Sequence, residues 1–444
     1  MIQRLPSPTG RLNAAQKVMY HWSELHPYNA THTVRLAGPI RLAALIGAIR
    51  DSYVFNRVGR IRLDIRTGIY RHSADPAPLL DVVPGDVSGE KLVPHLSTEL
   101  NRPFERPANR SFRFSVMEAG DNSHFVNLTY DHWVADSIAA RLILRHVLGR
   151  YLQIDDPDNG RPLGLHPGTF RDVFKDQLGV RGTAQSVWRS LSRWLQSRRV
   201  AQATYSCTAE MSVGYELHKT SADTVARLLA FARPMGVSVH DVLLAALARA
   251  MADVLPRRVC KANRELAISS IVDTRGDADA DLNESLGMFL AYHLVRCAPD
   301  RSASLAEVTG RLAAQTARIK SRRRYLDSMV DMKLVGKLLP TLSRKRWPHA
   351  VRKLLPMTAA ISNVRLHDTW VDRYRPGRIL EYSRSSPTGP MFPLVITPTT
   401  MADTMNVGVT FRRNGFSRER MDDFMARFLE QIERPDASQG RETR

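Results

Sequence analysis

The chain has little cysteine and no long apolar segment, and each absence excludes a class of protein. Its three cysteines, Cys207, Cys260 and Cys297, are odd in number and far apart. This spacing fits neither a disulfide framework nor a metal site, so we expect small buried hydrophobic residues in a reducing compartment. No apolar run approaches the roughly 18 residues of a membrane span. The N-terminus, MIQRLPSPTG, lacks the apolar region of a signal peptide. We therefore expect a cytoplasmic protein.

Several sequence motifs of enzyme chemistry are also missing. The chain contains no G-x-G-x-x-G, no Walker A loop and no H-E-x-x-H. It has no G-x-S-x-G nucleophile elbow. Its acidic run, Asp273, Asp277, Asp279 and Asp281, does not have the spacing of an EF-hand and is interpreted as a solvated loop. These absences predict that the protein holds no metal and no bound cofactor.

Acidic residues are scarce relative to basic ones. The chain has 44 Asp and Glu against 64 Lys and Arg, a formal net charge of +20. Residues 320–353 hold 11 basic and 2 acidic residues, and residues 181–199 hold 5 basic and no acidic ones. These two segments favour an anionic partner, but charge alone does not choose among nucleic acid, anionic lipid, a phosphorylated cofactor and an acidic protein. Because no nucleic-acid-binding motif accompanies the charge, nucleic acid is the least favoured. An amphipathic helix packed on its own lobe, with a solvated basic face, explains the pattern equally well.

The length of 444 residues suits two domains of about 200 residues each. Residues 154–171 are dense in Pro, Gly and Asp, which marks the end of the first domain. We therefore expect a first lobe over residues 1–171, a basic helical bridge over 172–204 and a second lobe over 205–433. Residues 434–444 are predicted to be a disordered tail.

Hydrophobic patterning predicts an α+β protein. Residues 111–118 and 124–130 alternate as two strands around a Gly-Asp-Asn turn, and apolar residues recur at helical spacing over 137–152. The second half is predicted to contain helices over 238–255, 305–324 and 417–433, with strands over 205–218, 266–276, 289–297, 358–366, 391–400 and 405–416. Strands and helices do not alternate regularly, which favours mixed or antiparallel sheets flanked by helices.

The connection from the hairpin to the helix, YDHWVADS (130–137), carries the main candidate for chemistry. His132 leaves the end of a strand, where a neutral imidazole can accept a proton from an attacking hydroxyl, amine or thiol. Asp136 lies four residues later, at the start of the helix. It can orient His132 directly, or point away and hold the loop through an arginine. From these residues alone, a purely structural polar connection is also an adequate interpretation.

The same stretch resembles the HHxxxDG motif of the chloramphenicol-acetyltransferase-like acyltransferases, which include condensation domains and wax ester, diacylglycerol and polyketide-associated acyltransferases. Here Asp131 replaces the first histidine and Ser137 the glycine. Further stretches resemble the family in the same order: LNAAQKVMY, SVHDVLLAALARAMA, ISSIVDTRGD with LNESLGMFL, AISNVRL and the last strand and helix. The resemblance spans nearly the whole chain.

This resemblance implies two chloramphenicol-acetyltransferase-like lobes with an active-site tunnel at their interface. It implies that His132 is the general base and that Asp136 is structural, with Arg275 as its candidate partner. Ser362 and Asn363 are the candidate oxyanion donors. The acceptor attacks the thioester directly, so no acyl-enzyme forms. Asp131 is expected to favour the charged form of His132, and Ser137 is expected to narrow the path of a pantetheine arm.

The implied activity is transfer of an acyl group from a coenzyme A or acyl-carrier-protein thioester to an alcohol or amine. The acceptor is a small molecule or a lipid, and we expect a monomer. The basic segments suit an acidic carrier protein, the phosphates of coenzyme A, or peripheral contact with the anionic inner face of a membrane. The rival hypothesis is a catalytically inactive, condensation-like module that recruits a carrier protein or a membrane.

Overall fold

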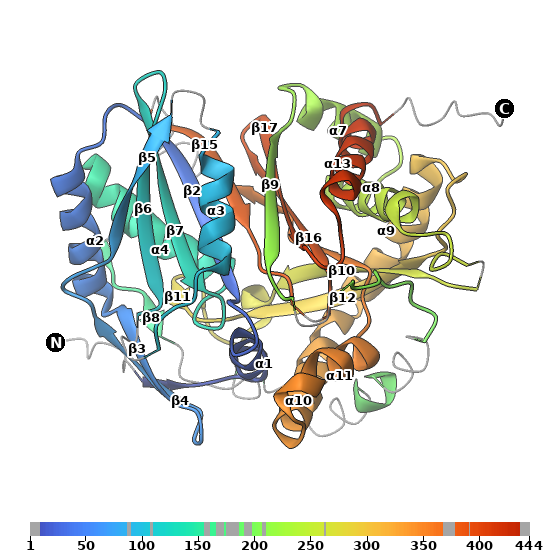
Figure 1. Ribbon diagram of the computed structural model, residues 1–444, viewed down its shortest axis with the longest axis horizontal. Helices are drawn as coiled ribbons and strands as arrows, with labels where there is room; N and C mark the ends of the chain where they lie inside the picture. Colours follow the sequence, from blue (N-terminus) through green and yellow to red (C-terminus); the bar gives the residue numbers. More distant parts are fainter. Residues whose placement is uncertain are drawn as a thin grey trace.

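The computed structural model describes most of the chain and shows two large β-sheets side by side, each with its own helices (Figure 1). The described residues are 9–86, 90–106, 110–154, 160–165, 173–174, 186–190, 198–206, 210–261, 263–366, 378–389 and 391–435. The predicted α+β class with two lobes is confirmed. Most of the predicted tail and most of the predicted bridge lie outside the described residues. No helix of the described part is long and apolar enough to cross a bilayer.

The first lobe is built on a five-stranded sheet. Its strands, in spatial order, are β15 (Ile379–Ser385), β2 (Asn29–Ala37), β7 (Ser123–Asp131), β6 (Phe112–Ala119) and β5 (Leu80–Asp86). The predicted hairpin is β6 and β7, and its turn uses positive φ at Asp121 and Asn122. A small sheet of β1 (Thr9–Arg11), β4 (Ile69–Ala74) and β3 (Gly59–Asp64) lies beside it.

Two helices, α2 (Leu42–Asn56) and α4 (Ser137–Leu152), cover one face of this sheet. Alternate strand residues such as Val34, Val126 and Leu128 point into the core that they share with these helices, because side chains on a strand alternate between faces. The opposite face is covered by α3 (Leu92–Asn101), whose leucines also contact Tyr215 of the second lobe.

The second lobe is built on a seven-stranded mixed sheet. Its strands, in spatial order, are β12 (Leu290–Cys297), β10 (Leu266–Asp273), β13 (Ala359–Ile361), β16 (Leu394–Met401), β17 (Thr404–Arg412) and β9 (Val213–Lys219), with β14 (Val364–Leu366) also on β16. The covering helices are α7 (Thr224–Ala232), α8 (Val239–Val254), α9 (Leu305–Ser321) and α13 (Arg418–Glu433). Ser238 caps α8 in a capping box with Asp241.

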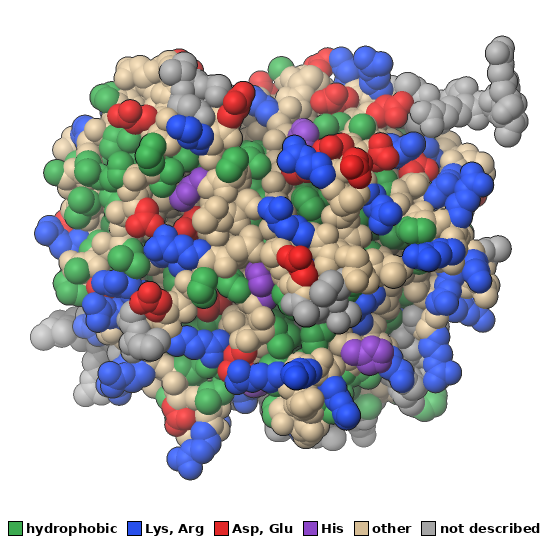
Figure 2. Space-filling model, in the orientation of Figure 1, with side chains coloured by type: hydrophobic (Ala, Val, Ile, Leu, Met, Phe, Trp, Pro, Cys, Tyr) green, Lys and Arg blue, Asp and Glu red, His purple; other side chains and the backbone are tan. Residues whose placement is uncertain are grey.

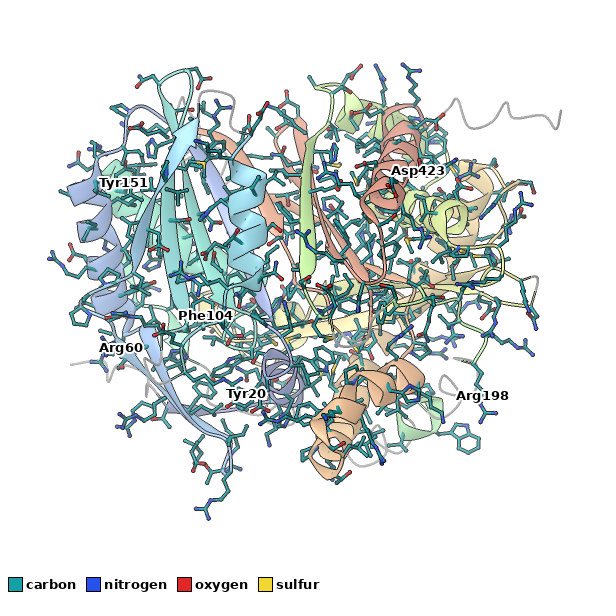
Figure 3. The ribbon with its side chains drawn as sticks, in the orientation of Figure 1. Tyr20, Arg60, Phe104, Tyr151, Arg198 and Asp423 are labelled. Atoms are coloured by element: carbon teal, nitrogen blue, oxygen red, sulfur yellow. The ribbon has the colours of Figure 1, made fainter. Side chains whose placement is uncertain are left out.

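The two lobes are joined by segments that pass from one to the other. Strand β15 follows most of the second lobe in the chain, yet pairs with β2 of the first sheet. Helix α1 (Ala14–Ser23) packs against α10 (Asp327–Leu338) and α11 (Trp347–Leu354), and side chains fill the space between the sheets (Figure 3). The predicted lobe boundaries stay predictions, although β15 shows that the first sheet uses a strand from outside residues 1–171.

The basic segment over residues 320–353 forms the end of α9, then α10 and α11, with short 3-10 turns between them. Its apolar residues Met329, Val335 and Trp347 are buried, whereas Arg344, Lys345 and Arg346 are exposed. Lys and Arg side chains are numerous along the lower and right-hand edges of the face in Figure 2. The segment is therefore amphipathic and packed on its own protein, with a basic outer surface. In the other basic segment, residues 186–190 are helical, and residues 198–199 are the only others described.

Candidate active site

His132 lies immediately after β7, in the short connection to α4. Its backbone N–H donates to the carbonyl oxygen of Tyr28 (3.0 Å), which continues the pairing of β7 with the chain before β2. The rings of Tyr28 and Tyr130 lie 5.9 and 5.7 Å from its imidazole. The strand end and two aromatic rings therefore fix the position of the ring, as a positioned catalytic group requires.

Burial keeps His132 neutral. The residue is 7 % exposed, and this loss of solvation lowers the pKa of His132, although its own backbone carbonyl and Asp136 act in the opposite direction. Its Nδ1 is shielded from solvent and makes no hydrogen bond of normal geometry within the described part of the chain. At neutral pH the imidazole is thus uncharged, which is the form that accepts a proton.

Asp136 is fully buried and caps α4. Its Oδ1 accepts from the backbone N–H of Ala139 (2.8 Å), and its Oδ2 accepts from the backbone N–H of Phe289 (2.9 Å). Both oxygens also accept from Arg275, whose Nη1 and Nη2 lie 2.8 and 3.0 Å away. Of the two geometries that the sequence left open, the structure has the one in which Asp136 holds the loop through an arginine.

Arg275 joins the two lobes through this ion pair. It begins the 3-10 turn after β10, and its guanidinium also donates to Asp273 (3.0 Å) and to the carbonyl oxygen of Ser285 (3.3 Å). Burial opposes its charged form, but Asp136 and Asp273 more than offset this, so the pKa of Arg275 is raised. The guanidinium therefore stays charged, and the carboxylate of Asp136 is neutralised by a bidentate partner.

The structure corrects the expectation that Asp131 favours the charged form of His132. Asp131 Oδ2 accepts from Trp133 Nε1 (2.8 Å), and Trp133 packs edge-on against Tyr20 of α1, which is labelled in Figure 3. Burial raises the pKa of Asp131 to about 7, against the lowering effect of Trp133. The carboxyl group is therefore partly protonated near neutral pH, and the acidic group that raises the pKa of His132 is Asp136.

Ser137 and Ser362 are brought together by Arg384, a residue that the sequence did not single out. Its Nη1 donates to Ser137 Oγ (3.0 Å), and its Nη2 donates to the carbonyl oxygen of Ser362 (2.6 Å). The hydroxyl at the motif's last position thus accepts from a buried guanidinium. The motif and the Ser-Asn turn between β13 and β14 meet at this side chain.

The two candidate oxyanion donors differ in how their polar atoms are used. The backbone N–H of Ser362 donates to the carbonyl oxygen of Ile396 (2.9 Å) and so is not available to a substrate. Asn363 Oδ1 is shielded from solvent and has no hydrogen-bond partner among the described residues. Their contribution to the reaction, and the tunnel that the resemblance implied, stay predictions.

Sequence reasoning missed Arg384, Arg141 and the contact of Tyr28 with His132. Arg384 lies in a strand, EYSRSS, that carries no recognisable motif, and it reaches the site because β15 crosses to the first sheet. Arg141 stands on α4 one turn after Ser137. Helical spacing placed it near the motif, and this was the one signal available from the sequence.

Comparison with known proteins places this arrangement in a family. A condensation-domain model matches residues 9–334, which is more than half of the chain. The chain belongs to the condensation-domain family. The predicted resemblance is therefore confirmed, and family membership supports an acyltransferase-type function in general terms. No curated protein matches the sequence.

Solved structures share the condensation-domain fold over nearly the whole chain. TRI3 trichothecene 15-O-acetyltransferase from Fusarium sporotrichioides is 12 % identical, with a TM-score of 0.70 over 96 % of this chain and 95 % of that one. The SgcC5 protein from Streptomyces globisporus is 17 % identical, with a TM-score of 0.66 over 96 % and 98 % of the two chains. The first condensation domain of the calcium-dependent antibiotic synthetase is 16 % identical, with a TM-score of 0.64 and 97 % of each chain covered. At these identities the likeness shows the fold alone.

Proposed function

We propose that the protein transfers an acyl group from a thioester to an alcohol or amine, with His132 as the general base. The observation that carries this proposal is a buried, neutral imidazole held at the end of β7, with Asp136 fully engaged elsewhere. An acetyltransferase and condensation domains among the structural neighbours support it. The comparisons give no support to the inactive alternative.

In this proposal the acceptor attacks the thioester carbonyl carbon directly. A ring nitrogen of His132 takes the acceptor's proton as the new C–O or C–N bond forms. The tetrahedral oxyanion then collapses, the C–S bond breaks, and the imidazolium returns the proton to the thiolate. The Ser362 hydroxyl and the Asn363 amide group are the candidate donors to the oxyanion, since the Ser362 backbone N–H is already used.

The donor is a phosphopantetheinyl thioester, either coenzyme A or an acyl carrier protein. A carrier protein is the better supported of the two, because the similar structures include condensation domains of synthases: the one from Monacolin K polyketide synthase MokA and the first one of the calcium-dependent antibiotic synthetase. The exposed basic residues 344–346 suit an acidic carrier surface. If the acceptor is a lipid, the proposal also includes contact of this surface with an anionic membrane.

The test is release of free thiol from a panel of acyl-coenzyme A and acyl-carrier-protein donors with pooled alcohols and amines. We expect release by the wild type that depends on the acceptor, and a 10²- to 10⁴-fold loss in His132→Ala, the usual effect of removing a general base. His218→Ala, which removes a half-exposed histidine of β9, is the matched control and should retain activity. Equal release by wild type and His132→Ala would remove the base from its assigned role.

A further inference from the structure

Two arginines, Arg141 and Arg384, lie together between α4 and the first sheet. Arg384 donates to Ser137 Oγ (3.0 Å), and Arg141 stands four residues after Ser137 on α4. Residues four apart lie on the same side of a helix, so Arg141 belongs to the same side of α4 as the Arg384 contact. The two guanidinium groups act on each other, because Arg141 lowers the pKa of Arg384.

The sheet contributes a polar group at the same place. Arg384 of β15 is directly opposite His32 of β2, and such pairs share one face of a sheet. His32 Nδ1 lies 2.6 Å from Tyr382 Oη, and His32 Nε2 lies 3.5 Å from Tyr130 Oη. Tyr130 in turn packs 5.7 Å from the His132 ring. The two arginines are therefore part of a polar cluster that adjoins the proposed base.

This cluster has more positive charge than its surroundings neutralise. Arg384 donates to neutral oxygens of Ser137, Thr399, Ser362 and Pro398, and no carboxylate of the described residues pairs with it. Arg141 makes no hydrogen bond and no ion pair with any residue in the described ranges. Burial lowers the pKa of Arg141, and it lowers the pKa of Arg384 to about 10.

The nearest acidic groups are already used. Asp136 and Asp273 both raise the pKa of Arg141, but both are in direct contact with Arg275. Arg384 is 1 % exposed and donates to four acceptors, whereas Arg141 is partly accessible and donates to none of the described residues. An interior cation without a counter-charge costs stability, and such a cost is retained where a ligand supplies the missing anion.

We propose that Arg141, held beside Arg384, binds the carboxylate of a substrate whose reacting group lies at His132. Arg141 is then a specificity-determining residue: the enzyme prefers an acceptor or an acyl group that carries a carboxylate. The role of Arg141 in substrate specificity rests on the proposed acyl transfer. The carboxylate site itself can be tested without turnover.

The kinetic test compares charged and neutral members of matched substrate pairs. One arm pairs an amino acid with its amide as acceptor, using a neutral acyl donor. The other arm pairs succinyl with butanoyl thioesters, using a neutral acceptor. In the wild type we expect the charged member of one pair to have at least a tenfold higher kcat/KM than the neutral member. A preference in the first arm places the carboxylate on the acceptor, and a preference in the second places it on the acyl chain. Arg141→Ala should abolish the preference through KM, with neutral substrates unchanged, and Arg141→Lys should keep part of it.

The matched control is Arg145→Ala, one turn further along α4, where the arginine pairs with Glu284 (3.1 Å). It should keep the full preference. A preference that survives Arg141→Ala, or one lost equally in Arg145→Ala, would overturn the inference while leaving the acyl transfer intact.

The binding test uses glutarate and neutral glutaramide as probes of thermal unfolding. Glutarate should raise the Tm of the wild type and of Arg145→Ala but not that of Arg141→Ala, and glutaramide should raise none of them. If no substrate is turned over, the proposed function fails and this measurement alone decides the site. Equal shifts for wild type and Arg141→Ala, or no shift with glutarate, would contradict the carboxylate site.

Discussion

Two clusters of charge flank the start of α4, and they differ in how their charge is neutralised. On one side Asp136 and Arg275 form a bidentate pair, and backbone N–H groups complete the carboxylate. On the other side Arg141 and Arg384 contact no carboxylate of the described residues. A buried charge with a complete set of partners holds a structure together, whereas one without them costs stability and is available to a ligand. The comparison therefore separates the structural part of the site from its proposed binding part.

The largest effect is expected where the complete pair is broken. Arg275→Met leaves the Asp136 carboxylate buried without its counter-ion, so we expect a loss of about 3–5 kcal/mol in the free energy of unfolding. Urea unfolding of wild type and variant measures this. Arg227→Met, which breaks an exposed ion pair with Asp223 at the start of α7, is the control and should leave the free energy of unfolding nearly unchanged. A loss that small in Arg275→Met would mean that the pair does not hold the lobes together.

A smaller loss is expected for Arg384→Met. The substitution removes an uncompensated cation, which is favourable, but it leaves the Ser362 carbonyl oxygen and the Ser137 hydroxyl without their donor. An unsatisfied buried group costs about 1–3 kcal/mol, so we expect a net loss of about 1–2 kcal/mol. Urea unfolding applies here as well. A loss as large as that of Arg275→Met would contradict this ranking and show that Arg384 stabilises the protein as strongly as Arg275 does.

The opposite sign is expected for Arg141→Met. Arg141 has no hydrogen bond to lose within the described part of the chain, and a methionine fills similar space without a charge. We expect a gain of about 1 kcal/mol in the free energy of unfolding in the absence of ligand. If Arg141→Met destabilises the protein as Arg384→Met does, Arg141 has a structural role. The contrast between the Asp136–Arg275 pair and an arginine available to a ligand would then be wrong.

The smallest effect is expected for Asp131→Asn, and it depends on pH. The pKa of Asp131 is about 7 in the folded protein and near the ordinary aspartate value of 3.8 in the unfolded chain. The folded state therefore binds more protons between these values, and the contribution of Asp131 to stability falls as pH rises through that window. Asp131→Asn should be more stable than the wild type at pH 8 and should lose this advantage at pH 4. Thermal unfolding at both pH values checks the sign.

The local secondary structure around this site could be predicted from the sequence, but the contacts between distant segments of the chain could not. The strand–loop–helix order around His132 followed from alternation and helical spacing, and Arg275 was named through the family resemblance. The position of β15 was beyond local patterning, because a strand's partner is set by the global topology. Arg384 was missed for that reason. The low pKa of His132 was missed as well, because it depends on burial, and the neighbouring Asp131 suggested the opposite.

The central claim, a buried neutral base at His132, is tested most directly by the pH dependence of kcat/KM with an alcohol acceptor, which does not titrate itself. The measurement is made in the Asp131→Asn background, so that the group with a pKa of about 7 does not contribute. Because burial lowers the pKa of His132, the account predicts a rate that is constant above pH 7 and falls in acid, with a midpoint below 6.5. His132→Ala in the same background should abolish both the rate and the inflection. A midpoint above 6.5, or an acid limb that survives in His132→Ala, would contradict the account.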